Sequence, residues 1–142
     1  MFYTPLIKKA LDVCFEAHKD QKDKTGLPYI YHPIHLAYNV ESEYEIITAL
    51  LHDVVEDTDY TFEDFLEMGF PKEVVEALTY LTHDKDVLYK DYVKNIKNNE
   101  LARTVKLADL RHNSDLSRLN VVNEEDRERQ KKYLEAIKFL QD

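Results

Sequence analysis

The sequence predicts an all-α protein, folded as one bundle of roughly six to eight helices. Two glycines and four prolines among 142 residues leave little material for hairpin turns or a glycine-rich phosphate loop. Hydrophobic residues make up 44% of the chain and charged residues 33%, enough for a buried core under a solvated surface. Apolar residues recur three and four positions apart along most of the chain, as they do in amphipathic helices.

Three helix starts are visible in the N-terminal half. Thr4 and Pro5 have the residue types of an N-cap and a first helical residue, Pro33 can open a second helix, and Ser42 with Glu45 matches a capping box. The third helix is apolar on most sides, so we expect it to be central and buried. The helices expected in this half cover residues 5–19, 33–40 and 43–56.

The C-terminal half carries similar signals. Thr61 and Asp64 form a weaker capping box, Gly69 is suited to close the short helix that follows, and Asn99 and Asn123 are N-cap residues. The helices expected in this half cover residues 62–68, 71–82, 89–97 and 100–115, with a last one beginning near 123.

Composition excludes several kinds of partner. The formal net charge is −9 and the pI is near 5.1, which argues against nucleic-acid binding by phosphate neutralisation. No apolar stretch approaches the about 18 residues needed to cross a bilayer, so we expect no membrane insertion. Cys14 is the only cysteine and the first residues do not resemble a signal peptide, so we expect a cytoplasmic protein.

The most unusual feature is a polar pair at the end of the most apolar helix, His52 and Asp53. A buried aspartate without a partner would cost several kcal/mol, so something must neutralise it. A divalent cation is one solution, with His32 and Asp109 as further candidate ligands. The alternative is that each of these is a polar residue satisfied by hydrogen bonds alone.

Three stretches of sequence carry a family resemblance. They are Tyr29-Ile30-Tyr31-His32-Pro33, the ten residues from Ala49 to Thr58, and Val105-Lys106-Leu107-Ala108-Asp109 followed by Asn113. Together they resemble the HD-domain phosphohydrolases, specifically the hydrolase half of RelA/SpoT enzymes. The resemblance covers roughly residues 18–119, and it implies that residues 1–142 form a single HD-type helical domain.

The resemblance also implies a reaction and a set of site residues. The family removes the 3′-pyrophosphate from guanosine tetra- or pentaphosphate (ppGpp or pppGpp), the alarmones of the stringent response. In that family, the positions matching His32, His52, Asp53 and Asp109 hold one divalent ion, usually manganese. Positions matching Glu56 and Asp57 assist catalysis, and the match of Asn113 lies at the nucleotide.

General chemistry is consistent with this assignment. A cation held by two imidazoles and two carboxylates keeps open positions, where a bound water becomes acidic enough to attack phosphorus. If the helix over 43–56 is continuous, Glu56 lies one turn after Asp53 and can orient that water, with Asp57 as its neighbour. The alternative for this acidic pair is a solvated helix end.

A chain of net charge −9 must concentrate positive charge where it binds a nucleotide. Lys106 and Asn113 lie one turn before and after Asp109, so the three share a helix face. We therefore expect contacts to the substrate from the residues Lys24, Tyr29, Lys106 and Asn113, with Lys22 and Arg111 as further cations.

Two tyrosines are also candidates for the nucleotide site. Tyr89 and Tyr92 lie three apart on an expected helix, where their rings could form a stacking wall for a purine. An aromatic pair at this spacing is also typical of a core.

The chain departs from the family pattern at two places. Asp23 stands where the family usually has an arginine that helps to hold the purine, and Leu110-Arg111 reverses the usual Arg-Leu order. These departures favour an alternative function, the hydrolysis of another small nucleotide or phosphorylated metabolite. A metal-containing nucleotide-sensing module without catalysis is a third hypothesis, against which Glu56 and Asp57 count. The expected partner is in each case a small-molecule nucleotide or a related phosphorylated compound.

Overall fold

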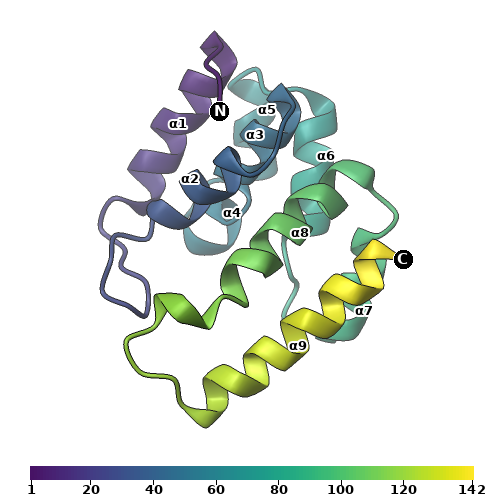
Figure 1. Ribbon diagram of the computed structural model, residues 1–142. Coiled ribbons are helices and arrows are strands. Elements are labelled where there is room, and N and C mark those ends of the chain that lie inside the picture. Colours follow the sequence, from purple (N-terminus) through teal and green to yellow (C-terminus); the bar gives the residue numbers. More distant parts are fainter.

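Nine α-helices and one short 3-10 helix make up the structure, a computed structural model that describes residues 1–142 (Figure 1). The all-α prediction is confirmed. The elements are α1 (Pro5–His18), α2 (Tyr31–Tyr38), α3 (Glu43–Leu51), α4 (Val54–Asp57), α5 (Phe62–Glu67), α6 (Lys72–Leu81), α7 (Tyr89–Ile96), α8 (Glu100–Asn113), the 3-10 helix η1 (Leu116–Arg118) and α9 (Glu124–Gln141).

The helix starts follow the capping residues of the sequence. The Thr4 side chain accepts a hydrogen bond from the Ile7 N–H at the start of α1, and Ser42 begins α3 with a complete capping box. The capping boxes at the starts of α5 and α9 are also complete. Gly69, which closes α5, has a φ of +91°, a conformation that other residues adopt only with strain.

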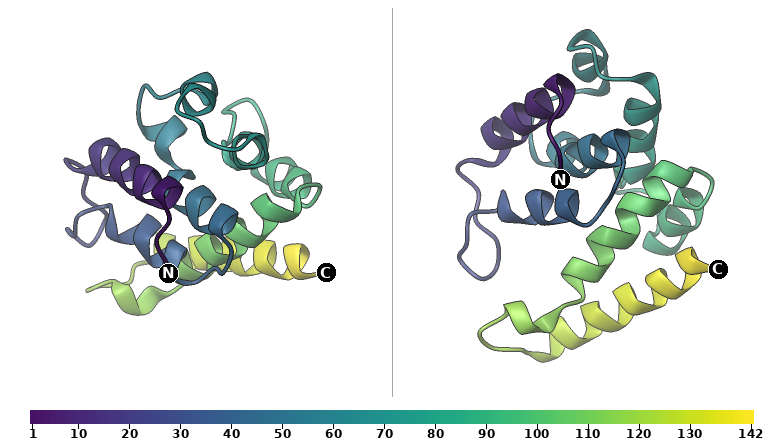
Figure 2. Two further views of the ribbon diagram at one scale, coloured as in Figure 1. Left: turned by 90° about the horizontal axis from the view of Figure 1, so that it is seen from above. Right: turned by 45° about the horizontal axis from the view of Figure 1, so that its top comes forward.

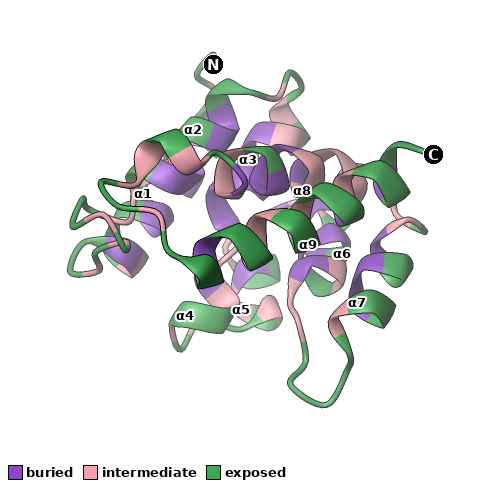
Figure 3. Ribbon diagram, turned by 60° about the horizontal axis from the view of Figure 1, so that its bottom comes forward, coloured by how far each residue is buried: buried purple, intermediate pink, exposed green.

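Helix α3 is the centre of the bundle. Its residues from Ile46 to Leu51 are all buried, and it packs against α1, α2, α6 and α8 (Figure 3). The prediction of a central, buried helix is therefore confirmed. Because α3 ends at Leu51, the polar residues that follow it in the chain lie at the end of the core, where other helices can contribute side chains to the same point.

Two helices differ from the sequence expectation. The helix expected over 43–56 is interrupted by a turn at His52 and Asp53, so that it forms α3 and the short α4. Helix α2 begins at Tyr31, which places His32 in its first turn and not at its boundary. Pro33 is tolerated there because the first N–H groups of a helix have no partner within it.

The last two long helices form one edge of the molecule. Helix α8 packs on α2, α3 and α6, and α9 runs beside α8 and α7 in both Figure 1 and Figure 2. Through these contacts, α9 contributes Lys132 and Tyr133 to the lining of a cavity that His52, at the end of α3, also lines.

None of the helices combines the length and the apolar character needed to cross a membrane.

Candidate metal centre and active site

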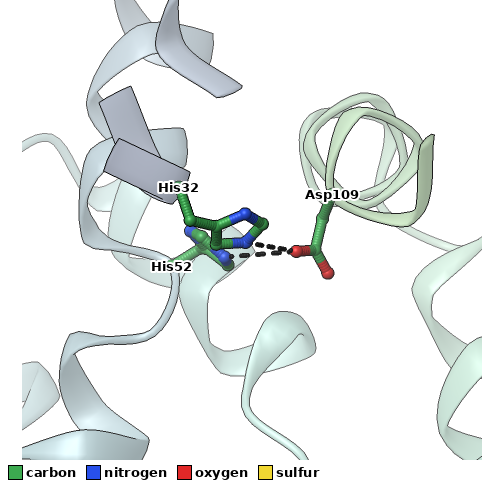
Figure 4. A group of neighbouring side chains, drawn as sticks. All are labelled: His32, His52 and Asp109. Carbon is green, nitrogen blue, oxygen red and sulfur yellow. Dashed lines mark hydrogen bonds and ion pairs between the residues drawn. The ribbon is translucent and has the colours of Figure 1, made fainter. Parts of the chain in front are cut away.

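Three buried side chains, from α2, from the turn after α3 and from α8, converge at the end of α3. The ligand atoms of His32, His52 and Asp109 all lie within 4.8 Å of one another. Asp109 Oδ1 lies 2.8 Å from His32 Nε2 and 3.5 Å from His52 Nε2, and Figure 4 shows the imidazoles and the carboxylate pointing toward one another. Ligand atoms about 3 Å apart are the spacing expected around a cation with bonds of about 2.1 Å.

The protonation pattern of His52 fits a cation. Its Nδ1 lies 2.7 Å from the Ala49 carbonyl oxygen, which fixes Nδ1 as the hydrogen-bond donor. Its Nε2 is buried without a hydrogen-bond partner, yet carboxylate oxygens of Asp53 and Asp109 lie 2.9 and 3.5 Å away. Positive charge must therefore sit beside Nε2, either as a proton or as a metal ion.

Asp53 lies beside this group without being one of the three convergent residues. Its Oδ2 contacts His52 Nε2 and accepts a hydrogen bond from the Tyr29 hydroxyl. Burial raises the pKa of Asp53, but the charge of the neighbouring His52 and the hydrogen bond from Tyr29 outweigh it and lower the pKa to about 2. Asp53 is thus an ionised carboxylate adjacent to the convergent ligands.

Asp109 is held by two neighbours on its own helix. Lys106 Nζ lies 2.9 Å from Oδ2, and the Asn113 side chain donates to Oδ1 at 3.1 Å. Burial would raise the pKa of Asp109, but Lys106 and the two imidazoles keep it well below its usual range. The shared face expected for Lys106, Asp109 and Asn113 is therefore present, although both neighbours contact Asp109 itself.

The two acidic residues of α4 have different surroundings. Glu56 lines the cavity beside the convergent residues, and its carboxylate accepts a hydrogen bond from the His83 backbone N–H. Partial desolvation and the charges of Asp53 and Asp57 raise the pKa of Glu56 despite this bond. Asp57 is exposed and lines neither this cavity nor the neighbouring one beside Lys24 and Tyr29.

Two cavities flank the convergent residues. The active-site cavity has a volume of about 280 Å³ and is lined by residues that include His52, Asp53, Glu56, Lys106, Asp109 and Lys132. The loop-side cavity has a volume of about 340 Å³ and is lined by residues that include Lys22, Asp23, Lys24, Tyr29, Arg118 and Arg129. Asn113 and Tyr133 line both cavities, so the two are neighbours.

Tyr89 and Tyr92, the pair expected to stack a purine, both line the active-site cavity, with ring centres 6.0 Å apart. Tyr92 is buried, and its hydroxyl donates to the Leu81 carbonyl at 2.8 Å. The His83 ring stacks on Tyr92 at 4.5 Å, and Lys106 Nζ lies 5.2 Å from the centre of the Tyr92 ring. The Tyr92 ring is thus largely packed against its neighbours, and the stacking role of this pair stays a prediction.

Several residues near the site carry no clear signal in the sequence. His112 Nδ1 lies 2.7 Å from His32 Nδ1, and its place three residues after Asp109 on the same helix could have indicated this. Lys132 and Tyr133 reach the active-site cavity from α9, which lies outside the stretches that carry the family resemblance. Arg111 is exposed and lines a separate cavity with His35 and His112.

The loop before α2 uses its aspartate internally. Asp23 Oδ1 accepts hydrogen bonds from the backbone N–H groups of Thr25 and Leu27 and from the Thr25 hydroxyl. Burial raises the pKa of Asp23, but these bonds together lower it. Asp23 therefore shapes the loop that carries Lys24 and Tyr29 into the loop-side cavity.

Known proteins resemble this chain along most of its length. It is 37% identical over 129 residues to the guanosine-3′,5′-bis(diphosphate) 3′-pyrophosphohydrolase MESH1 of Danio rerio, an alignment that spans 81% of this chain and 71% of that protein. It is 38% identical over 123 residues to MESH1 of Xenopus tropicalis, covering 76% of this chain and 67% of that protein. No protein-family model matches the chain.

Longer relatives match with only part of their length. The chain is 40% identical over 88 residues to a guanosine-3′,5′-bis(diphosphate) 3′-pyrophosphohydrolase of Aquifex aeolicus, but that alignment covers 59% of this chain and 12% of the Aquifex protein. Among solved structures, one described as a metazoan orthologue of SpoT that hydrolyses ppGpp superposes with a TM-score of 0.78 at 26% identity. That match covers 99% of this chain and 87% of the other.

Proposed function

Since the chain belongs to the family of guanosine-3′,5′-bis(diphosphate) 3′-pyrophosphohydrolases that includes MESH1, we propose that it is a metal-dependent hydrolase that removes the 3′-pyrophosphate from ppGpp or pppGpp. The observation that carries this proposal is the convergence of two imidazoles and a carboxylate on a buried point that requires positive charge. We also propose that residues 1–142 act as one HD domain.

The proposed ligands are His32, His52, Asp53 and Asp109, and the proposed cation is Mn²⁺. This donor set suits such a metal, since imidazole and carboxylate are both common ligands of first-row divalent ions. When bound, the cation supplies Lewis acidity, which acidifies water and polarises a phosphoryl oxygen. The protein orients the ligands through Ala49 on His52 and through Tyr29 on Asp53.

Glu56 is the proposed general base. Its carboxylate lines the same cavity as His52, Asp53 and Asp109, and the His83 N–H holds it in place. A pKa raised above the ordinary glutamate value makes Glu56 a better proton acceptor at neutral pH. Asp57 remains a proposed helper that acts on Glu56 by its charge, since it does not reach the cavity.

Two neighbouring cavities can bind the two phosphorylated ends of one substrate. We propose that the nucleoside and its 5′-phosphates occupy the loop-side cavity, where Lys24 and Tyr29 lie. The 3′-diphosphate then reaches the active-site cavity past Asn113, which lines both. Lys106, which is tied to Asp109, offsets the charge of that carboxylate and of the incoming phosphates.

A different phosphorylated nucleotide is the second candidate substrate. Asp23 lines the loop-side cavity and brings negative charge to the position where the family usually has arginine. A phosphate is repelled there, whereas the N–H groups of a base are not. Asp23 therefore affects which nucleotide base the protein accepts more than it affects the reaction itself.

A substrate panel tests the proposal. Purified protein with Mn²⁺ is incubated with ppGpp, pppGpp and the corresponding adenosine and monophosphorylated nucleotides, and the released pyrophosphate and phosphate are measured. Pyrophosphate released from ppGpp or pppGpp supports the main proposal, and turnover of another nucleotide alone supports the second. If metal binds and no nucleotide is hydrolysed, the protein is a sensing module and the proposed function is wrong.

A further inference from the structure

The active-site cavity has one cation that no carboxylate neutralises, Lys132 of α9. Its Nζ lies over the ring of Tyr89, 4.2 Å from the ring centre, and 5.6 Å from the centre of the Tyr133 ring. It forms no ion pair, whereas Lys106, the other lysine of this cavity, lies 2.9 Å from Asp109 Oδ2. The two aromatic rings thus stabilise the Lys132 ammonium group by cation–π interaction and leave its positive charge unpaired.

Tyr89 contributes a second unsatisfied group to the same cavity. Its hydroxyl is buried and has no hydrogen-bond partner, although Tyr89 lines the active-site cavity. A buried hydroxyl without a partner is unfavourable, so buried polar groups in proteins are nearly always paired. A ligand oxygen in the cavity can supply the missing partner.

The position of this pair indicates which part of a ligand it meets. The His83 ring lies 6.1 Å from the Tyr89 ring in an edge-to-face arrangement, and the His83 backbone N–H donates to Glu56. Tyr89 and Lys132 therefore lie on the Glu56 side of the active-site cavity, and neither lines the loop-side cavity.

The charges of the cavity require a cation at this end. Asp53, Glu56 and Asp109 line it and are acidic, and Lys106 is already paired with one of them. A diphosphate that enters brings further negative charge into the same volume. Lys132 is the remaining lysine side chain on the cavity wall that can compensate for it.

We propose that Tyr89 and Lys132 form an anion subsite that binds the outer phosphate of the departing diphosphate. This inference rests on the proposed function for the identity of the ligand, but the subsite itself recognises inorganic pyrophosphate. Lys132 supplies a charge-assisted hydrogen bond to the outer phosphate, and the Tyr89 hydroxyl donates a second one. The subsite makes the enzyme selective for a diphosphate over a monophosphate at the scissile position.

Binding of the inorganic products tests the subsite directly. The full chain, loaded with one equivalent of Mn²⁺ and freed of excess metal, is titrated with inorganic pyrophosphate and separately with inorganic phosphate in a calorimeter. Lys132→Gln is expected to weaken pyrophosphate binding about tenfold, and Tyr89→Phe about threefold or more. Phosphate binding is expected to change less than about twofold in both, because a single phosphate beside the ligands does not reach the subsite.

Lys131→Gln is the matched control, since Lys131 is the neighbouring exposed lysine and lines neither cavity. Circular dichroism and Tm establish that each variant is folded. Equal effects of Lys131→Gln and Lys132→Gln, or unchanged pyrophosphate binding in Lys132→Gln, would overturn the subsite.

The same variants separate this inference from the proposed function. If the parent protein releases pyrophosphate from ppGpp while Lys132→Gln binds pyrophosphate normally, the subsite is wrong and the function stands. If pyrophosphate binding depends on Lys132 but neither ppGpp nor pppGpp is hydrolysed, the subsite stands and the proposed function is wrong.

Discussion

The hydroxyl of Tyr29 donates a hydrogen bond to Oδ2 of Asp53, the same oxygen that lies 2.9 Å from His52 Nε2. Burial and the charge of Asp53 raise the pKa of Tyr29, so its hydroxyl remains a neutral donor. The Tyr29 ring is itself packed between the rings of His18 and His32, with centres 4.9 and 5.7 Å away. Tyr29, which the sequence suggests as a substrate contact, thus also positions a proposed metal ligand.

Tyr29→Phe is expected to weaken Mn²⁺ binding about tenfold or more, the usual effect of removing a hydrogen bond behind a metal ligand. The ring packing is retained, so Tm measured without metal should change little. Calorimetric titration with Mn²⁺ measures the affinity. Tyr31→Phe serves as control, because Tyr31 is exposed and its hydroxyl makes no hydrogen bond. Equal Mn²⁺ affinity in the two variants would exclude the positioning role.

Asp53→Ala and Glu56→Ala are expected to separate metal binding from catalysis. Asp53 touches His52 Nε2, so its removal should abolish tight Mn²⁺ binding. The Glu56 carboxylate is hydrogen-bonded to the His83 N–H and to none of the proposed ligands. Its variant should therefore keep Mn²⁺ and lose about 100-fold or more in kcat, the usual contribution of a general base. Metal content by elemental analysis and kcat with ppGpp are the two readouts. Equal loss of metal in both variants would show that these roles are assigned wrongly.

Tyr92→Phe is expected to lower stability without changing KM. The Tyr92 hydroxyl donates to the Leu81 carbonyl in the buried interior, and leaving that carbonyl unpaired costs about 1–3 kcal/mol. A loss of about 1 kcal/mol lowers Tm by about 4 °C in a chain of this size. Tyr89→Phe is the comparison, since the Tyr89 hydroxyl has no partner to lose and its Tm should not fall. If Tyr92→Phe instead raises KM and leaves Tm unchanged, Tyr92 contacts the nucleotide and does not act mainly on stability.

The metal-free protein is expected to lose stability as the pH rises above neutrality. Burial by itself lowers the pKa of His52, but the carboxylates of Asp53 and Asp109 raise it well above the ordinary value of 6.5. The stabilisation from protonated His52 is therefore fully present below pH 6.5 and is lost as the pH rises through the raised pKa. Tm measured in EDTA should fall across this range.

Mn²⁺ replaces the proton beside His52, so saturating metal should remove this fall in Tm at alkaline pH. His52→Asn supplies the control, because it cannot carry the proton and its metal-free Tm should lack this component of the pH dependence. If the Tm of the parent protein in EDTA changes with pH above 6.5 in the same way as the Tm of His52→Asn, protonated His52 does not stabilise the metal-free protein.

Much of the fold can be predicted from the sequence because its signals are local. A capping box such as Ser42 with Glu45 involves residues three apart, and the apolar pattern of residues 46–51 predicts a buried helix without any knowledge of its neighbours. The break after Leu51 is less visible, since Val54 and Val55 continue the apolar pattern. A turn at the polar pair between them satisfies the carboxylate of Asp53 through Tyr29 and His52, and neither contact is a property of the helix alone.

The sequence by itself determined the helical class and the capping residues, because helix periodicity and capping are encoded within a few neighbouring residues. It also pointed to the group of His32, His52 and Asp109, since each lies in one of the three stretches that carry the family resemblance. That these three side chains act as ligands stays a prediction. Only the tertiary structure decided that Tyr29 supports Asp53, that Tyr92 is covered on its ring, and that Lys132 of α9 reaches the active-site cavity. Each of these depends on how helices far apart in the chain pack together, and a side chain has no partner until that packing exists.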